Sequence, residues 1–506
     1  MITAICIGFL LGVLLARTVN VSSGEQMILL LSGVVLMVVA LLSRMRMLIP
    51  IAILGGCLLG YIRASKLAVN LTAYNDYVGR EVIVLGRIDG DPTLSDGQIS
   101  FGVEDVIITL DDQSKSLPGK IWLRFKSDGQ RLDRYDNVVI KGAVDAGFGA
   151  YAATLQQAQL IETVGTGADP MGQLRNNFTA RLDQVLDSNE AGLAMGLLAG
   201  QKSILDDATQ EAFVGASLTH ILVASGYNLT VLVRFARRLF AKRSRLVALI
   251  LSFTLMTLFT GVTGSSASMQ RAVLVSGLSL LLWYVGRRAH PVVLLSVVAA
   301  ITILINPTQL WGDAGWYLSF GSFAGVIILA PMITDLLLLL TTNCSLSDDK
   351  SDDEVDEKDL ALIARLARRV GAFPSSLVQI LIETTSAQLM TLPIIALFMG
   401  SVSLTGFVTN IIVLPLLPMT MAMSFMAGLV AILLPINWAR VIAVPANWLL
   451  RIIITTANWG ATLPGAEIEF QPTLLTVVIY YLVMLVIIMA LKIITNHNFY
   501  LDNVIE

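Results

Sequence analysis

The sequence predicts a polytopic α-helical membrane protein with a small β-domain outside the membrane. Of its 506 residues, 55% are hydrophobic and only 14% are charged, and the mean hydropathy is +0.74. Soluble proteins contain roughly half apolar and a quarter charged residues, so this balance excludes an ordinary soluble protein. The apolar residues also form long runs, many of which approach the roughly 20 residues that a membrane-spanning helix needs.

Three apolar segments, at residues 3–16, 26–43 and 47–62, form an N-terminal group of membrane helices within residues 1–66. The first is short for a spanning helix. No basic segment precedes it and no convincing cleavage site follows it, so we expect a retained helix rather than a signal peptide.

Residues 70–165 lack long apolar runs, and their pattern predicts a β-domain. Short β-like runs are separated by Gly, Asp and Pro, and they lie at 81–87, 98–107, 119–125, 137–144 and 153–163. Five short strands in so small a domain favour a closed OB-like barrel. A fragment of a β-sandwich is the alternative.

The rest of the chain is predicted to be helical. Residues 168–212 form interfacial helices, because apolar residues such as Leu174, Phe178 and Leu182 recur at helical spacing. Residues 213–495 form a membrane domain with candidate spans at 213–233, 246–264, 267–285, 291–306, 314–340, 376–398, 402–418, 419–435 and 472–491. With the first three, this makes about twelve transmembrane helices. The charged stretch 341–370 is expected to be a solvated linker.

Basic residues set the orientation, because loops rich in Lys and Arg stay in the cytoplasm. They crowd one short loop and mark two others: Arg234, Arg237, Arg238, Lys242, Arg243 and Arg245, then Arg44 with Arg46, and Arg287 with Arg288. Counting spans between them places both termini and the charged linker inside and the β-domain outside. Residues 437–468, which contain Trp438 and Trp448, are then expected to lie along the outer interface.

A histidine and a Ser-Gly pair interrupt the apolar run at 217–229. If this segment is a continuous helix, five of its residues, most of them polar, share a sector of roughly 100°. They are Ser217, His220, Ala224, Tyr227 and Asn228. This stripe predicts a polar path through the membrane, with Ser225 and Gly226 kinking the helix. The alternative is that His220 and Asn228 are hydrogen-bonding contacts between packed helices.

Catalysis and metal binding have little support in the sequence. On a helix, Ser225 and His220 are about 140° apart and cannot pair, and no G-x-S-x-G elbow accompanies them. Cys6, Cys57 and Cys344 are scattered, as are the three histidines, so no metal site or cofactor is expected. No Walker-type nucleotide motif occurs. We expect a transport protein rather than an enzyme.

Other polar residues interrupt the later spans. Arg271 follows a run of small and hydroxyl residues, and an Arg at a helix centre costs about 2.5 to 3.5 kcal/mol, so it needs a carboxylate, an anion or water. Near a helix end it can instead extend outward to the interface. Asp313 lies at the same predicted outer mouth, and an ion pair with Arg271 is an alternative to separate roles. Gln388 and Asn410 lie among prolines and small residues typical of broken, tightly packed helices.

Several of these blocks, in this order, resemble the ComEC competence family. They are the run from His220 to Leu229 with the preceding Ala191-Gly192 to Gly200 and Phe213 to Gly215, then Gly264 to Ala272, Pro307 to Phe320, and Gln388 to Pro415. The resemblance covers nearly the whole chain. It implies a multi-pass channel in the bacterial cytoplasmic membrane, among membrane lipids, that passes single-stranded DNA during natural transformation. It also implies an extracytoplasmic DNA receptor and a cytoplasmic ATPase as partners.

Two departures from the family limit this resemblance. Asn228 stands where many members have a second histidine. The chain ends at Glu506 without the metallo-β-lactamase-like domain of longer members, so degradation of the other DNA strand would belong to a separate nuclease. A transporter of a small solute or a lipid-linked substrate is the alternative function, and a membrane enzyme that uses Ser225 is the third.

The β-domain is an unfavourable surface for DNA on average, because residues 71–165 contain nine Lys and Arg against fourteen Asp and Glu. Binding therefore needs a local basic and aromatic surface. The best candidates are Lys120, Trp122, Arg124 and Lys126. Strand alternation places Trp122, Arg124 and Lys126 on one face, and Ile121, Leu123 and Phe125 on the core face. A charged, solvated face without a ligand is the alternative.

Overall fold

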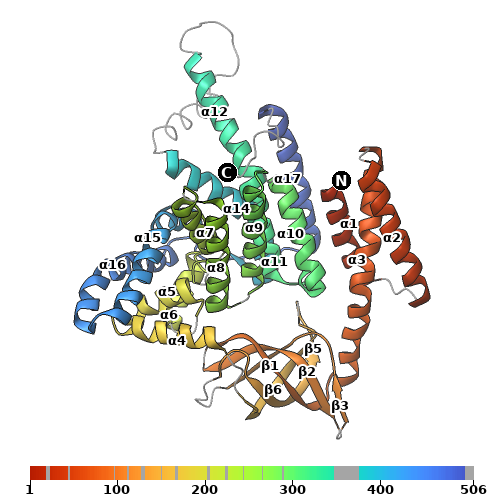
Figure 1. The fold of residues 1–506 in the computed structure, drawn as a ribbon, viewed down its shortest axis with the longest axis horizontal. Coiled ribbons are helices and arrows are strands. Elements are labelled where there is room, and N and C mark those ends of the chain that lie inside the picture. The colour runs from red at the N-terminus through yellow and green to blue at the C-terminus, as the bar shows by residue number, and fades with distance from the viewer. Residues whose placement is uncertain are drawn as a thin grey trace.

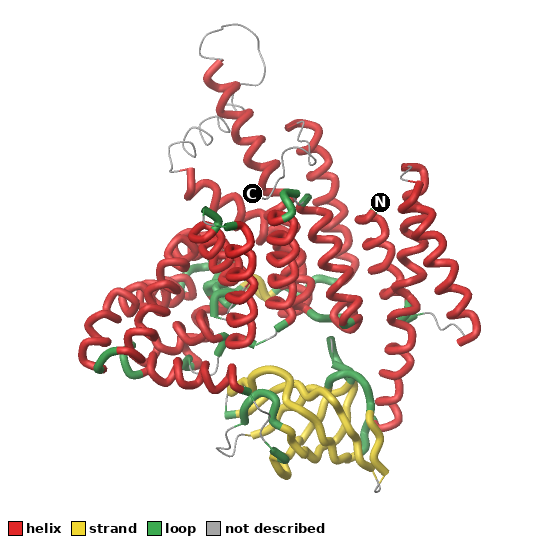
Figure 2. Tube along the Cα trace, viewed as in Figure 1, coloured by secondary structure: helices red, strands yellow, loops and turns green. Residues whose placement is uncertain are grey.

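The computed structural model shows a bundle of helices with a β-barrel at one end (Figure 1). It describes residues 1–495 except 19–22, 44–45, 96, 111–112, 127–131, 150, 166–168, 202–204, 223–225, 243, 265, 288–289 and 347–374. Most of the predicted charged linker therefore lies outside the described residues. Figure 2 shows the strands gathered in the barrel, apart from a short pair formed by β7 (Ser401–Val402) and β8 (Ile468–Glu469).

The N-terminal helices pack unusually closely. They are α1 (Ile2–Leu15), α2 (Ser23–Ser43) and α3 (Ile49–Thr72), followed by the short helix η2 (Ala73–Tyr77). Gly8 and Gly12 on α1 lie against the backbone of α3, and Gly56 and Gly60 on α3 lie against the backbone of α1. A Cβ on Gly12 would lie 1.9 Å from the carbonyl oxygen of Cys57. Both helices thus carry the G-x-x-x-G spacing that lets backbones touch in membranes.

The β-domain is a closed, five-stranded OB-like barrel, as predicted. Its strands are β1 (Glu81–Ser95), β2 (Gln98–Leu110), β4 (Ile121–Lys126), β5 (Asn137–Ala146) and β6 (Ala153–Thr163). β1 pairs with β2 and β5, β2 pairs with β4, β4 pairs in parallel with β6, and β6 pairs with β5 to close the ring. The additional strand β3 (Gln113–Ser116), which was not predicted, extends β2.

The core of the barrel follows from strand alternation. Phe101, Ile121 and Leu123 are almost fully buried, while the residues between them point outward. Each such side chain contributes about 1.5 to 3 kcal/mol on burial. Tyr74 of η2 enters the same cluster, so the end of α3 is packed onto the barrel.

Three short helices follow the barrel and support a long helical hairpin. They are α4 (Pro170–Asp183), α5 (Ser188–Ala199) and α6 (Asp207–Gly215), and they pack against α15 (Gly406–Leu433) and α16 (Ile436–Ala461), at the left of Figure 1. The apolar residues between these five helices form the largest buried cluster of the described chain. α16 is amphipathic, with Trp438 and Trp448 exposed on its outer face.

The remaining helices form the upright part of the bundle. They are α7 (Gly226–Phe240), α8 (Arg245–Thr263), α9 (Ala267–Tyr284), α10 (Pro291–Ile305), η3 (Pro307–Trp311), α11 (Ala314–Ala324), η4 (Gly325–Leu329), α12 (Ala330–Leu346), α14 (Ser375–Met399) and α17 (Leu474–Thr495). Within the described residues, seven helices are long and apolar enough to cross a membrane. The predicted total of about twelve also counts shorter or broken helices and stays a prediction.

Three predicted spans are wrong. The segment 213–233 is not one helix, because α6 ends at Gly215, residues 216–222 form turns, and α7 begins at Gly226. The segments 402–418 and 419–435 are not two spans, because α15 runs through Pro415 and Pro418 as a single helix. Membrane helices tolerate internal proline where neighbouring helices satisfy the freed backbone groups.

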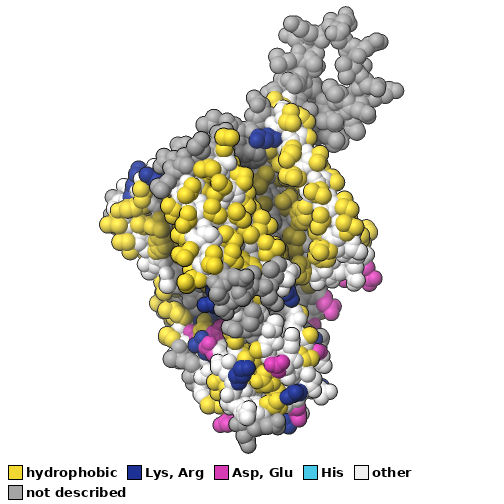
Figure 3. Space-filling view, turned by 90° about the vertical axis from the view of Figure 1, so that its right-hand side faces the viewer, with side chains coloured by type: hydrophobic (Ala, Val, Ile, Leu, Met, Phe, Trp, Pro, Cys, Tyr) yellow, Lys and Arg dark blue, Asp and Glu magenta, His cyan; other side chains and the backbone are white. Residues whose placement is uncertain are grey.

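Exposed basic side chains gather at the end of the bundle away from the barrel. α8 ends beside the barrel and begins at the opposite end, where the α7–α8 connection lies (Figure 1). Arg234, Arg238, Lys242 and Arg245 are exposed there. Between the ends, Figure 3 shows a face covered largely by hydrophobic side chains, with charged side chains on the barrel below. An exposed apolar surface of this kind is the expected boundary with lipid.

Candidate functional site

The outward face of β4 presents the predicted basic and aromatic side chains. Ile121 and Leu123 are buried, whereas Arg124 and Lys126 are exposed and Trp122 is half-buried. This alternation confirms the predicted division of the strand into two faces. In OB-folds, the second and third strands and the loops beside them bind oligonucleotides; in this barrel those strands are β2 and β4.

The charge near β4 is more favourable than the average of the domain. The β2 residues that pair with Lys126, Arg124 and Trp122 are the neutral Gln98, Ser100 and Gly102. Lys120 differs, because its ammonium group pairs with Asp89 at 2.5 Å and lies 3.6 Å from Glu104. Two carboxylates thus offset the charge of Lys120, and the basic surface reduces to Arg124 and Lys126.

The β5–β6 loop adds aromatic side chains to this face. The ring centroid of Tyr151 lies 5.1 Å from that of Trp122 and 5.5 Å from that of Phe148. Gly102 makes the arrangement possible, because a Cβ there would lie 3.0 Å from the Tyr151 ring. Burial, with smaller contributions from Asp89 and Asp313, raises the pKa of Tyr151 to about 12, so its hydroxyl stays protonated. Phe148 is exposed, Trp122 and Tyr151 are partly exposed, and aromatic rings beside cations suit stacked nucleobases.

Two buried arginines attach the barrel to the helices. Arg134 binds Asp169 at the start of α4 and donates to the carbonyl oxygen of Gly261 in α8 at 2.6 Å. Arg175 of α4 pairs with Asp91 of β1 at 2.6 Å. Burial alone would raise the pKa of Asp169, but hydrogen bonds from Arg134 and the Gly172 amide lower it overall. These contacts fix the barrel relative to the bundle.

Arg271 is buried at the start of α9, and no carboxylate among the described residues lies within ion-pair distance of it. It is 3% exposed, and its Nη2 atom donates to the carbonyl oxygen of Gly315 at 2.6 Å. Its guanidinium lies over the Phe320 ring, 5.5 Å from the centroid. Among the described residues, Nε and Nη1 have no hydrogen-bond partner. A buried cation with two free donors is costly, and an anion would satisfy it.

Asp313 has a different role from the ion pair considered above. Its carboxylate accepts a hydrogen bond from the Trp316 amide at 3.1 Å and caps the start of α11. No ion pair between Asp313 and Arg271 occurs within the described part of the chain. Both residues nevertheless belong to the barrel end of the bundle, because α9 and α11 both begin there (Figure 1).

The turn at 216–222 is held by hydroxyl groups from the start of α15. Ser403 and Thr405 donate to the carbonyl oxygen of Gly215 at 2.7 and 3.0 Å, and Thr409 donates to that of Ala216 at 2.9 Å. Ser217 has φ +55°, a left-handed conformation that costs about 1 to 2 kcal/mol for a residue with a side chain. These contacts explain why the chain breaks here instead of continuing as a helix.

His220 lies on this turn and not on a helical stripe. Its side chain is exposed to solvent, yet the surrounding protein lowers its pKa, with the Ser217 carbonyl partly offsetting that effect. The ring is therefore neutral at pH 7 and acts as a hydrogen-bonding group. Ser225 lies outside the described residues.

Asn228 points into packed protein. It is 1% exposed, and its amide donates to the carbonyl oxygen of Leu197 in α5 at 3.2 Å. This geometry favours the alternative interpretation of Asn228 as a contact between helices. Gly226 has a related role, since a Cβ there would lie 2.7 Å from the Cβ of Ala272 on α9.

Gln388 and Asn410 approach the same turn from the other side. A Cβ on Gly406 would lie 2.6 Å from the Gln388 amide nitrogen and 2.6 Å from the Ser217 Cβ, so glycine leaves room for both side chains. Asn410, one turn further along α15, is 3% exposed. Within the described chain, Gln388 Oε1 and Asn410 Oδ1 accept no hydrogen bond. The turn thus borders a region with unsatisfied polar atoms.

Sequence reasoning did not identify several of these residues. Phe148 and Tyr151 carry a signal, because Gly147-Phe148-Gly149-Ala150-Tyr151 places two rings in a glycine-rich turn between strands. The Arg134–Asp169 pair and the Gly406 contact have no signal in the sequence, because each joins distant parts of the chain. No group of His, Cys, Asp and Glu suited to a metal ion occurs in the described residues.

Comparisons with known proteins point to one family. A family model described as "Competence protein" matches residues 197–493. The chain is also 21% identical over 345 residues to "ComE operon protein 3" of Bacillus subtilis (strain 168). That alignment covers 65% of this chain and 39% of the relative, so the chain spans about two fifths of the relative's length. No solved structure matches. Because the family model covers more than half of the sequence, the chain belongs to the competence protein family.

Proposed function

We propose that the chain is a conduit that passes single-stranded DNA across the cytoplasmic membrane during natural transformation. Family membership supports a role in DNA uptake. One structural relationship carries the proposal further. The β5–β6 loop, which supplies Tyr151 and Phe148 to the aromatic face, reaches the η3–α11 connection through Gly149 and Gly312. The candidate DNA surface therefore continues onto the ends of the helices.

On this proposal, the strand first contacts Trp122, Arg124 and Lys126 on the barrel. Stacking and phosphate contacts of this kind tolerate any base sequence, as uptake requires. Arg271 then offers two free donors to a phosphate at the barrel end of the bundle. Asp313 shapes this mouth by capping α11.

Deeper in the bundle, His220, Gln388 and Asn410 supply neutral hydrogen-bonding groups. Neutral groups suit passage, because a polyanion held by many buried cations would leave slowly. Gly226 lets α7 pack closely against Ala272 of α9, and Asn228 positions the start of α7 against α5. No step in this proposal requires catalysis by the chain.

The partners are also part of the proposal. An extracytoplasmic receptor delivers DNA to the barrel, and a separate nuclease removes the second strand. A cytoplasmic ATPase pulls on the strand, and it is expected at the end that exposes Arg234, Arg238, Lys242 and Arg245.

A deletion strain tests the function against its alternatives. Loss of transformation with normal growth supports the conduit, provided that the intact gene restores transformation. Normal transformation with a growth or envelope defect would instead indicate transport of a solute or a lipid-linked substrate. A Ser225→Ala variant provides the control for catalysis, because a nucleophile is lost with its hydroxyl whereas a conduit retains its shape.

A further inference from the structure

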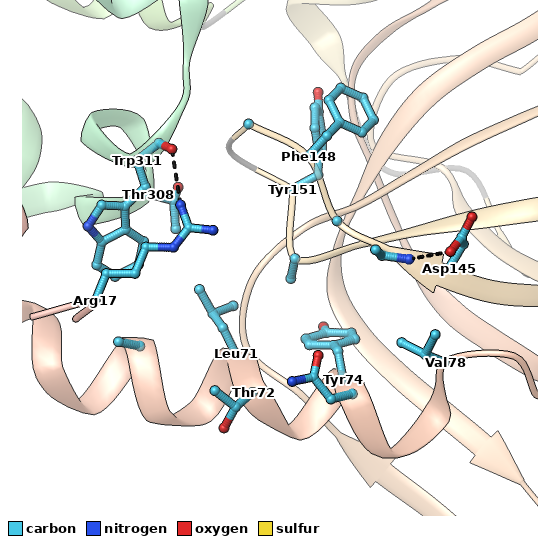
Figure 4. A pocket seen from close by; sticks show the side chains of 16 residues that line it. Arg17, Leu71, Thr72, Tyr74, Val78, Asp145, Phe148, Tyr151, Thr308 and Trp311 are labelled. Carbon is cyan, nitrogen blue, oxygen red and sulfur yellow. Dashed lines mark hydrogen bonds between the residues drawn. The ribbon is translucent and has the colours of Figure 1, made fainter. Parts of the chain in front are cut away.

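A pocket with a volume of about 500 Å³ lies between the barrel and the membrane helices. Its walls come from the end of α1, the α3–η2 segment, the β5–β6 loop and η3 (Figure 4). Four aromatic side chains line it: Tyr74, Phe148, Tyr151 and Trp311. The volume is within the range of about 300 to 1,000 Å³ that is typical of small-molecule sites.

The polar groups of the pocket are not all in use. Trp311 donates its indole N–H to the Val13 carbonyl oxygen at 3.0 Å, and Thr308 donates its hydroxyl to Asn306 at 2.7 Å. Tyr74, in contrast, is 1% exposed, and its hydroxyl has no hydrogen-bond partner among the described residues. Burying such a group costs about 1 to 3 kcal/mol, and because the hydroxyl is itself buried, a ligand recovers this cost only if the pocket wall shifts to expose it.

The charged groups lie at opposite ends of the pocket. Figure 4 shows Arg17 beside Trp311 at one end and Asp145 at the other. Arg17 makes a long hydrogen bond, 3.3 Å, to the Trp311 carbonyl oxygen and is exposed. Asp145 accepts hydrogen bonds from Gln156 and from the Ala146 amide. A ligand with an anionic end and a polar, planar end fits this polarity.

Building on the conduit function, we propose that this pocket binds one nucleotide of the incoming strand. Its phosphate lies at Arg17, its base lies between the aromatic walls, and the edge of the base faces Asp145. Phe148 and Tyr151 belong both to the pocket and to the aromatic face with Trp122. A strand on the barrel can therefore turn one base into the pocket without leaving the surface.

A phospholipid headgroup would share the phosphate contact with Arg17. The aromatic walls and their continuity with the β4 face favour a nucleotide, because base stacking contributes about 1 to 3 kcal/mol per base and a headgroup does not stack. The pocket thus acts as a holding site beside the mouth of the bundle.

Crosslinking of full-length protein in lipid nanodiscs tests this proposal. An oligothymidine with 5-iododeoxyuridine at one position is irradiated with the protein, and the adducts are mapped by mass spectrometry. We expect adducts on Trp311 as well as on Trp122. Adducts on Trp122 alone would overturn the pocket site and leave the barrel face intact.

Binding of a fluorescent oligothymidine to the same nanodiscs supplies the second measurement. Tyr74→Phe removes only the free hydroxyl and should weaken binding about three- to tenfold, and Arg17→Gln should weaken it about tenfold or more. Lys66→Gln is the matched control, because Lys66 is exposed on α3 outside the pocket lining; it should leave binding unchanged. Equal affinities for Tyr74→Phe, Arg17→Gln and the parent would refute the proposal.

Two further comparisons separate the alternatives. If Arg17→Gln lowers the amount of co-purified anionic lipid and leaves oligonucleotide binding unchanged, the pocket is a headgroup site and the proposal is wrong. If cells with either pocket variant transform normally while cells with His220→Leu do not, the conduit function is supported and the pocket proposal is wrong. Loss of oligonucleotide binding together with reduced transformation supports both.

Discussion

Gly149 of the barrel and Gly312 of the bundle touch through their backbones. A Cβ on Gly149 would lie 2.9 Å from the Gly312 carbonyl oxygen, and a Cβ on Gly312 would lie 2.7 Å from the Gly149 Cα. Gly149 also has φ +58°. The contact joins the aromatic β5–β6 loop to the residue before Asp313, which caps α11.

We therefore expect Gly149→Val to reduce transformation at least tenfold while the protein remains abundant, because the side chain forces the loop away from the mouth. Gly90→Ala is the control, since Gly90 has φ +81° but no atom within 4 Å of a Cβ. Gly90→Ala therefore introduces backbone strain of about 1 to 2 kcal/mol but no steric clash. Similar transformation in both variants would argue against a role for the contact itself.

The β4 face is expected to bind single strands by stacking and by charge. In full-length protein, Trp122→Leu should weaken oligothymidine binding by about 1 to 3 kcal/mol at any salt concentration. Arg124→Gln and Lys126→Gln should each lower the slope of log affinity against log salt by about 0.7. Lys120→Gln should have a smaller effect, because Asp89 and Glu104 already offset that charge. Equal effects of all three basic substitutions would contradict the local surface described here.

Substitutions of His220 and Asn228 are expected to have different effects, on DNA uptake and on stability respectively. His220→Leu should abolish most DNA uptake with normal protein levels, and His220→Gln should retain part of it, because the neutral ring acts through hydrogen bonds. Asn228→Leu should instead lower the thermal stability, since it leaves the buried Leu197 carbonyl oxygen without its donor at a cost of about 1 to 3 kcal/mol. Thermal melting in detergent and uptake of labelled DNA measure the two effects. Normal uptake by His220→Leu protein would remove His220 from the path.

Attachment of the barrel should depend on pH. The pKa of Asp169 is lowered from 3.8 in the folded protein. Near this pH the folded protein therefore binds fewer protons than the unfolded chain does. The stability contributed by its pair with Arg134 is present above about pH 3.8 and is lost as the pH falls through the lowered pKa. Asp169→Asn should mimic the acid state at pH 7, because it leaves Arg134 buried without its partner at a cost of about 3 to 5 kcal/mol. Protease sensitivity of the segment that joins the barrel to α4 measures both, and an unchanged digestion pattern would contradict the attachment.

The β4 face could be predicted from sequence because alternation follows from the pleat of a single strand. Trp122 and Arg124 therefore point outward as expected. The neighbours of that face could not be predicted, because Tyr151 reaches it only through closure of the barrel. β3 was missed because Gln113-Ser114-Lys115-Ser116 has no apolar alternation and pairs only along one edge of β2.

The turn at 216–222 could not be predicted from the local sequence. A helical wheel assumes a continuous helix, and the apolar residues around His220 gave no reason to doubt it. The break depends on Ser403, Thr405 and Thr409, which lie far along the chain and bind its carbonyl groups. For α15 the error is the reverse. Pro415 and Pro418 suggested that a helix ends there, but the helix continues because neighbouring helices pack against it and compensate for the prolines.

A photo-crosslinking side chain at Thr219 tests the conduit most directly. Thr219 is exposed beside His220, and Ile479, which is 51% exposed on the apolar surface of α17, is the lipid-facing control. We predict that irradiation during uptake of labelled DNA traps single-stranded DNA at residue 219 and not at residue 479. DNA that enters the cell at the normal rate without an adduct at residue 219 would contradict passage past this turn.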